Sequence, residues 1–210
     1  MNQAWPVIER RAESAAIAEA LESTNGSRGV LVEGLTGTGK TTLVTSCADT
    51  LPRPIRWLTG TAASQSKPFG AVRRLVDPTS PWRLAALLSD MSRGLSEELA
   101  DGTIVVDDAH LLDPLSATLL NQLATGGALA LVVAIRTGEP APAAITALRK
   151  DRGLGRVTLG CFDRDETETV LVAALGGPVE SRTVDRIATA TGATPCIYGA
   201  WSRVRLPSAT

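Results

Sequence analysis

Short runs of apolar residues alternate with longer amphipathic stretches over most of the chain. Such a run, bounded by turn residues, is typical of a strand buried in a parallel sheet. Because helical patterns separate the runs, the sequence predicts an α/β fold: a doubly wound parallel sheet with helices on both faces. Five runs have strand length: Val30–Val32, Ile55–Leu58, Thr103–Val106, Leu129–Ile135 and Val157–Leu159.

Residues that favour helix starts lie between these runs. Asp113 and Pro114 precede the stretch LSATLLNQLA, and Pro142 opens AAITALRK. A capping carboxylate or a fixed φ suits the first turn, where backbone N–H groups lack helical partners. Further helices are expected over Glu9–Glu22 and Thr42–Asp49, and loops around one short helix over Ser64–Ser80.

The last fifty or so residues have a different character. From Asp163 onward the patterns are helical only, and they are interrupted at residues 176–178 and again at 192–195 by glycine and proline. Such interruptions end helices. We therefore expect an α/β body over residues 1–160 and a small helical lid over residues 161–210.

Composition narrows the class of protein. Hydrophobic residues make up 44% and charged residues 20% of the 210 residues, as in soluble globular chains. The 21 Lys and Arg are scattered among 22 Asp and Glu, so the chain does not resemble a nucleic-acid reader. No window approaches the ~20 apolar residues of a membrane span, and no secretory signal is evident, which favours a cytoplasmic protein without membrane contact. The three cysteines lack metal-site spacing and are expected to be small buried residues: Cys47, Cys161 and Cys196.

One glycine-rich segment carries the strongest chemical signal. Gly34 to Thr41 reads GLTGTGKT, which matches the phosphate-binding P-loop pattern G-x-x-x-x-G-K-T between an expected strand and an expected helix. Glycines let successive N–H groups converge on phosphate oxygens. Lys40 adds charge for the outer phosphates, and Thr41 supplies a hydroxyl for Mg²⁺. The expected nucleotide-binding residues of this segment are Thr36, Gly37, Thr38, Gly39, Lys40, Thr41 and Thr42.

Two carboxylates follow the third apolar run. Asp107 and Asp108 fall at the carboxyl edge of the predicted sheet, where ligands of open α/β sheets bind. Asp107 is the candidate Mg²⁺ ligand, and Asp108 is the candidate to orient or deprotonate an attacking water. Because Asp108 is shorter than a glutamate, turnover is expected to be slow. The alternative is a pair of acids that open a loop and cap a helix.

Other polar residues near these strand ends fit more than one role. His110, the one histidine, either contacts a water, reports the nucleotide state, or packs at the strand exit. Asp113 suits a helix cap better than a ligand.

Arg136 ends the fourth run, where a cation can sense or stabilise a terminal phosphate; the alternative is a surface arginine. Arg149 and Arg152 suit a helix C-terminus better than an arginine finger for a neighbouring subunit.

Taken together, the motifs resemble the ATPase domain of signal-transduction ATPases with numerous domains, in particular the maltose-regulator type of large LuxR-family transcriptional activators. The likeness extends over ERRAE at the start, VLVEGLTGTGKTTLV, KPFGAVRRLV, TIVVDDAHLLD, VVAIR and TGATPCIYGAW. Glu9, Ala193 and Thr194 depart from the family pattern. The resemblance implies a strand order of 5-1-4-3-2 and places Val7, Ile8 and Arg10, with Pro195 of the lid, near an adenine.

This resemblance implies an ATP/ADP switch with Mg²⁺ and slow ATP hydrolysis. Relatives of this type continue into a winged helix, a helical-repeat sensor and a DNA-binding helix-turn-helix, none of which is recognisable here. Contact with DNA is therefore expected only through such a domain, and nucleotide-dependent oligomers are expected. The alternatives are an AAA+-type ATPase that loads or remodels a macromolecule and, less well supported, a small-molecule kinase. Adenine over guanine follows from the likeness, since no Asn-Lys-x-Asp motif is present.

Overall fold

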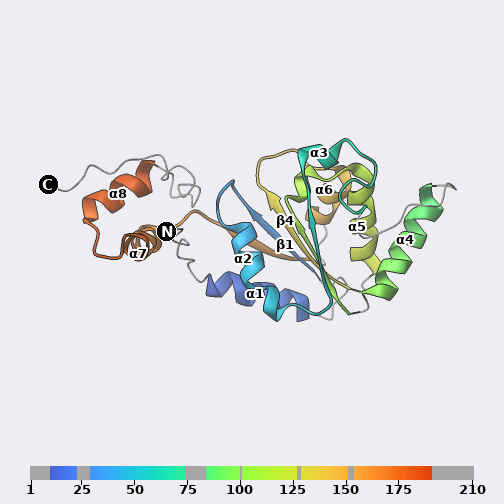
Figure 1. Cartoon of the computed structure of the whole chain (residues 1–210), viewed down its shortest axis with the longest axis horizontal. Helices are drawn as coiled ribbons and strands as arrows, with labels where there is room; N and C mark the ends of the chain where they lie inside the picture. The colour runs from blue at the N-terminus through green and yellow to red at the C-terminus, as the bar shows by residue number, and fades with distance from the viewer. Residues whose placement is uncertain are drawn as a thin grey trace.

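A computed structural model describes residues 10–22, 29–73, 84–99, 101–126, 129–150 and 154–190 (Figure 1). Its centre is one sheet of five parallel strands in the order β2-β3-β4-β1-β5. Taken from the other edge, this is the expected order 5-1-4-3-2, so the predicted fold is confirmed. The strands are β1 (Gly29–Gly34), β2 (Ile55–Thr59), β3 (Thr103–Asp107), β4 (Ala130–Arg136) and β5 (Gly155–Leu159).

Helices cover both faces of the sheet (Figure 1). On one face, α1 and α2 pack against Val30 and Val32 of β1; on the other, α4, α5 and α6 surround a larger core that contains Leu31. This alternation along β1 follows from the two-residue repeat of a strand. The helices are α1 (Arg11–Glu22), α2 (Lys40–Ser46), α3 (Ala62–Gln65), α4 (Leu84–Glu98), α5 (Pro114–Gly126), α6 (Ala143–Lys150), α7 (Arg164–Leu175) and α8 (Ser181–Ala190), with short 3₁₀ turns η1 (Ala48–Thr50) and η2 (Ala109–Leu111).

The predicted strands agree with the described ones to within two residues at each end. Helix α3 begins two residues before the segment Ser64–Ser80, in which one short helix was expected, and no bounds were predicted for α4. The helix after the P-loop begins at Lys40, two residues before the expected Thr42. The first residues of this helix are polar, so no apolar pattern marked its start. The chain turns into the helix at Gly39, which has a left-handed conformation with φ 88°. Cys47 is buried as expected; Cys161 is partly exposed, and Cys196 lies outside the described residues.

Helices α7 and α8 form a pair of their own beyond the end of β5 (Figure 1). Asp163 begins α7 with a capping box, in which its side chain accepts the Glu166 N–H and Glu166 accepts the Asp163 N–H. Arg164 of α7 donates to Asp185 of α8 at 2.8 Å. Within the described part of the chain, every helix is too short or too polar to cross a membrane.

Asp113 connects two segments that are distant in the sequence. Its side chain, 1% exposed, accepts the Ser116 N–H at 3.0 Å and so caps α5 as predicted. The same oxygen accepts the Phe69 N–H at 2.9 Å, and the second oxygen accepts the Ser116 hydroxyl at 2.5 Å. Phe69 is itself buried, in a left-handed conformation with φ 55°. One carboxylate therefore fixes both the start of α5 and the loop that follows α3.

Replacement of Asp113 by alanine should lower the free energy of unfolding by about 2–4 kcal/mol, because it removes a cap and leaves the buried Phe69 N–H without a partner. Urea denaturation measures this loss. The matched control is Asp163→Ala, which removes a cap in an exposed setting and should cost about 1 kcal/mol. Equal losses in the two variants would contradict the second role of Asp113.

Candidate nucleotide-binding site

The P-loop connects the end of β1 to the start of α2. Gly34 leaves no room for a side chain, since a Cβ there would lie 2.6 Å from Thr38 Oγ1 and 2.8 Å from the Leu159 carbonyl oxygen. Gly37 and Gly39 have φ angles of 77° and 88°, which favour glycine. The glycines therefore shape a tight loop at the N-terminus of α2, and a helix N-terminus favours an anion.

Lys40 folds back over this loop. Its Nζ donates to the carbonyl oxygens of Gly34 at 3.0 Å and Leu35 at 2.7 Å, and the side chain is buried. Thr38 is also buried and donates to the Leu35 carbonyl at 3.0 Å. Thr36 and Thr42 are exposed. The lysine is thus held by the backbone of the same loop that would receive phosphate.

Thr41 and Asp107 meet across the gap between α2 and β3. The Thr41 hydroxyl donates to Asp107 Oδ2 at 2.7 Å although the two residues are 66 positions apart. The other oxygen, Oδ1, accepts the Asp108 N–H at 2.9 Å. A hydroxyl and a carboxylate oxygen at this separation are the hard oxygen donors that Mg²⁺ prefers, so these two residues fit a magnesium site beside the loop.

The backbone at Asp108 is tightly constrained. It has a left-handed conformation with φ 48°, uncommon for a residue other than glycine. Gly60, which follows β2, donates its N–H to the Asp107 carbonyl at 2.9 Å. A Cβ at Gly60 would overlap with the Asp108 carbonyl oxygen. The role of Gly60 was not predicted; its only signal in the sequence is a glycine two residues beyond the expected strand Ile55–Leu58.

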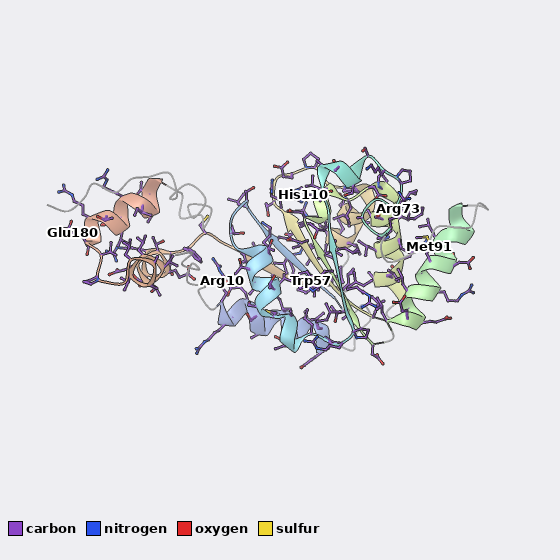
Figure 2. All side chains as sticks on the ribbon, viewed as in Figure 1. Arg10, Trp57, Arg73, Met91, His110 and Glu180 are labelled. Carbon is purple, nitrogen blue, oxygen red and sulfur yellow. The ribbon has the colours of Figure 1, made fainter. Side chains whose placement is uncertain are left out.

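His110 lies near both Asp108 and Arg136. His110 Nδ1 is 3.8 Å from Asp108 Oδ1, and the ring is 3% exposed at the sheet end beneath α3 (Figure 2). Burial lowers the pKa of His110 below its ordinary value of 6.5; Arg136 and Lys40 lower it further, while Asp108 and Glu139 oppose the shift.

Arg136 ends β4 opposite Gly34, with Nη1 3.9 Å from the Glu139 carboxylate. Within the described residues, His110 Nδ1 and Arg136 Nε are the buried side-chain atoms without a hydrogen-bond partner. The expected sensor arginine therefore lies at the same sheet edge as the P-loop.

Arg10 lies between the sheet and the α7–α8 pair (Figure 2). It donates to Glu13 at 3.0 Å and to the Gly160 carbonyl at 3.1 Å, and its guanidinium lies 4.9 Å from the centre of the Phe162 ring. These contacts connect the N-terminal segment to the connection between β5 and α7. The other residues expected near an adenine, Val7, Ile8 and Pro195, lie outside the described residues.

Arg149 has a partner that the sequence did not reveal. Its Nε donates at 2.8 Å to the carboxylate of Glu33, a largely buried residue of β1 just before the P-loop. Arg149 is therefore paired within its own chain. From the sequence, only a favourable interaction with the C-terminus of its helix was expected. Arg152, the other candidate for an arginine finger, lies outside the described residues.

A five-stranded parallel sheet with a glycine loop between β1 and α2 and an acid after β3 defines the P-loop NTPase fold. In agreement, a family model described as an AAA ATPase domain matches residues 6–79, which include the P-loop. No curated protein matches the sequence.

Solved structures share the fold at low sequence identity. A signal transduction ATPase with numerous domains and a tetratricopeptide repeat sensor, from Pyrococcus horikoshii, has a TM-score of 0.60 and 13% identity; the match covers 100% of this chain and 33% of that one. Cdc6p from Pyrobaculum aerophilum has a TM-score of 0.58 and 17% identity, over 93% of this chain and 59% of that one. The Orc1 protein of Aeropyrum pernix, in complex with DNA, has a TM-score of 0.53 and 16% identity, over 84% and 52%. The chain thus spans a third to three fifths of these proteins.

The magnesium dependence of ATP binding should be lost selectively in Asp107→Asn. This change removes the charge but keeps an oxygen that accepts the Asp108 N–H. Titration calorimetry with ATP, in Mg²⁺ and in chelator, should show the Mg²⁺ enhancement falling by about tenfold or more in the variant, with unchanged affinity in chelator. Asp108→Asn is the matched control and should keep the enhancement. The opposite pattern would assign the metal to Asp108.

Proposed function

We propose that the chain is an ATP- and ADP-binding switch domain, with slow ATP hydrolysis, of a signal-responsive transcriptional regulator of the large LuxR-family type. The observation that carries the nucleotide part is the Thr41–Asp107 hydrogen bond, because it joins the P-loop to the acid that would share its Mg²⁺. The AAA ATPase match and the fold likeness to a multidomain signal-transduction ATPase support the switch part. The regulator type rests on the motif resemblance.

The residues at the sheet edge divide the work of binding and hydrolysis. The P-loop N–H groups and Lys40 bind the phosphates, and Thr41 and Asp107 would hold Mg²⁺, whose charge offsets that of the phosphate oxygens when it is bound. Asp108 orients a water and accepts its proton. The water oxygen bonds to the γ-phosphorus while the bond to the β–γ bridging oxygen breaks, which releases ADP and phosphate. Arg136 stabilises the charge on the terminal phosphate.

Two features support slow rather than fast turnover. The acid beside the metal ligand is an aspartate, which reaches less far toward a water than a glutamate. Arg149, at the end of α6, is paired with Glu33 of its own chain, which makes it a poor candidate for an arginine supplied to a neighbouring subunit. Long-lived bound nucleotide suits a switch, in which ATP and ADP select different conformations, better than a motor.

Residues 161–210 would act as the lid of this switch. The contacts of Arg10 with Gly160 and Phe162 support this role, because they join the segment expected over the adenine to the start of the α7–α8 pair. A nucleotide held between the two would couple its presence to the position of the helices. Further domains of a larger regulator would sense the signal and bind DNA, and ATP would favour oligomers.

The second candidate is an AAA+-type ATPase that loads or remodels a macromolecular partner. The fold likeness to Cdc6p and to Orc1 in complex with DNA favours it. It differs from the switch in requiring polymer-stimulated hydrolysis and an arginine supplied to a neighbouring subunit, for which Arg152 is the candidate. Turnover that rises with added DNA and falls in Arg152→Ala would support this alternative.

A thermal melt in Mg²⁺ with ADP, ATP or GTP tests the switch directly. At about a hundred times its dissociation constant, a specific ligand adds roughly 2.7 kcal/mol to the free energy of unfolding. We expect such stabilisation from ADP and ATP, none from GTP, and its loss in Lys40→Ala. Lys67→Ala, an exposed lysine outside the P-loop, is the control and should respond as the parent does. An unchanged response in Lys40→Ala would contradict the P-loop assignment.

A further inference from the structure

His110 stands out among the polar side chains that the proposed site does not use. It is the only histidine in the 210 residues, and it lies in the turn η2, two residues after Asp108. The ring is almost completely buried, yet its Nδ1 makes no hydrogen bond within the described structure. A buried nitrogen without a partner is unfavourable, and most buried polar side-chain atoms in proteins have one. A partner that becomes available in another state would remove this cost.

Asp108 is a candidate partner. Its Oδ1 lies 3.8 Å from His110 Nδ1, too far for a hydrogen bond but within reach of a small side-chain rotation. Among the described residues, no group donates a hydrogen bond to this carboxylate. The Asp108 side chain is 35% exposed, whereas the ring is 3% exposed. The carboxylate is thus less enclosed than the ring and has more room to turn.

The backbone around both residues is firmly held. The Leu111 N–H donates to the Asp108 carbonyl at 2.8 Å, and Gly60 packs against that carbonyl without room for a side chain. Any approach of the two groups must therefore come from the Asp108 side-chain torsions. Such a rotation costs little compared with a backbone movement.

The charges around the ring favour its neutral form. Burial, Arg136 and Lys40 lower the pKa of His110, while Asp108 and Glu139 oppose the shift. Helix α3, which packs against η2, has no charged residue over Ala62–Gln65. A neutral imidazole carries one N–H, which either ring nitrogen can hold. The nitrogen that faces Asp108 is Nδ1.

We propose that His110 is a positioning residue for ATP hydrolysis: its Nδ1–H donates to the Asp108 carboxylate when nucleotide is bound and aims the second carboxylate oxygen at the attacking water. The inference rests on the proposed function. It assigns to His110 no contact with nucleotide or metal, so its removal should slow hydrolysis without weakening ATP binding. If the ring only filled space, its replacement would not selectively change either the rate of hydrolysis or the affinity for ATP.

Two substitutions with amide side chains distinguish a positioning role of His110 from a space-filling one. In His110→Asn the side-chain amide can take the place of Nδ1, and in His110→Gln it can take the place of Nε2. We expect His110→Asn to keep kcat within about threefold of the parent, and His110→Gln and His110→Ala to lose about tenfold or more, with the dissociation constant for ATP unchanged in all three. Thermal melts establish that each variant is folded. Equal kcat in all three variants, or a His110→Asn as slow as His110→Ala, would overturn the proposal.

A second measurement does not depend on turnover. Because the chain has one histidine, a long-range ¹H–¹⁵N spectrum of the ¹⁵N-labelled, untagged protein reports the His110 tautomer without ambiguity. With Mg²⁺ and a non-hydrolysable ATP analogue we expect the Nδ1–H tautomer, and loss of this preference in Asp108→Ala. The Nε2–H tautomer in the bound parent overturns the inference. ATP binding without turnover contradicts the hydrolysis part of the proposed function, and the tautomer then decides the His110–Asp108 contact alone.

Discussion

Hydrogen bonding between parallel strands fixes their register, and so fixes where each strand ends relative to its neighbours. The candidate site depends on that register. Gly34 of β1 is paired with Arg136 of β4, and Thr59 of β2 is paired with Asp107 of β3. The loop, the acid and the arginine therefore reach the same edge of the sheet. A slip of one residue would turn the side chains of these strands to the opposite face, so the buried core on both faces protects the alignment of the site. Core packing and the alignment of the candidate site therefore depend on the same strand register.

Within this frame, the groups assigned to phosphate and metal already have protein partners. Lys40 is held by two carbonyls of its own loop, and Asp107 accepts hydrogen bonds from Thr41 and from the Asp108 backbone. These contacts hold the side chains near their places before a ligand arrives, which reduces the ordering cost of binding. Glu33, one residue before the loop, also has a protein partner, Arg149. Its buried carboxylate would repel phosphate if Arg149 did not offset its charge.

The sequence was most informative where a local pattern carries the structure. The five strands were predictable because their residues are apolar over consecutive positions, and Asp113–Pro114 marked the start of α5 because capping is a local interaction. The strand order followed from resemblance alone, since spacing does not determine it. The Glu33–Arg149 pair, the fit of Gly60 against Asp108 and the contact of Asp113 with the Phe69 backbone were not predictable. Each joins residues that only the folded chain brings together.

The polar groups that the proposal assigns to hydrolysis differ from those it assigns to binding of phosphate and metal. Among the described residues, His110 Nδ1 and Arg136 Nε are buried without a hydrogen bond, and the Asp108 carboxylate stands 3.8 Å from the imidazole. Groups that bind a ligand in both nucleotide states are best fixed in advance, whereas groups that distinguish ATP from ADP must gain contacts in one state only. The unpaired atoms gather at the ends of β3 and β4, the two strands that deliver Asp108 and Arg136. If the proposed function holds, that division between satisfied and unsatisfied groups would let one fold bind both nucleotides and still respond to the difference between them.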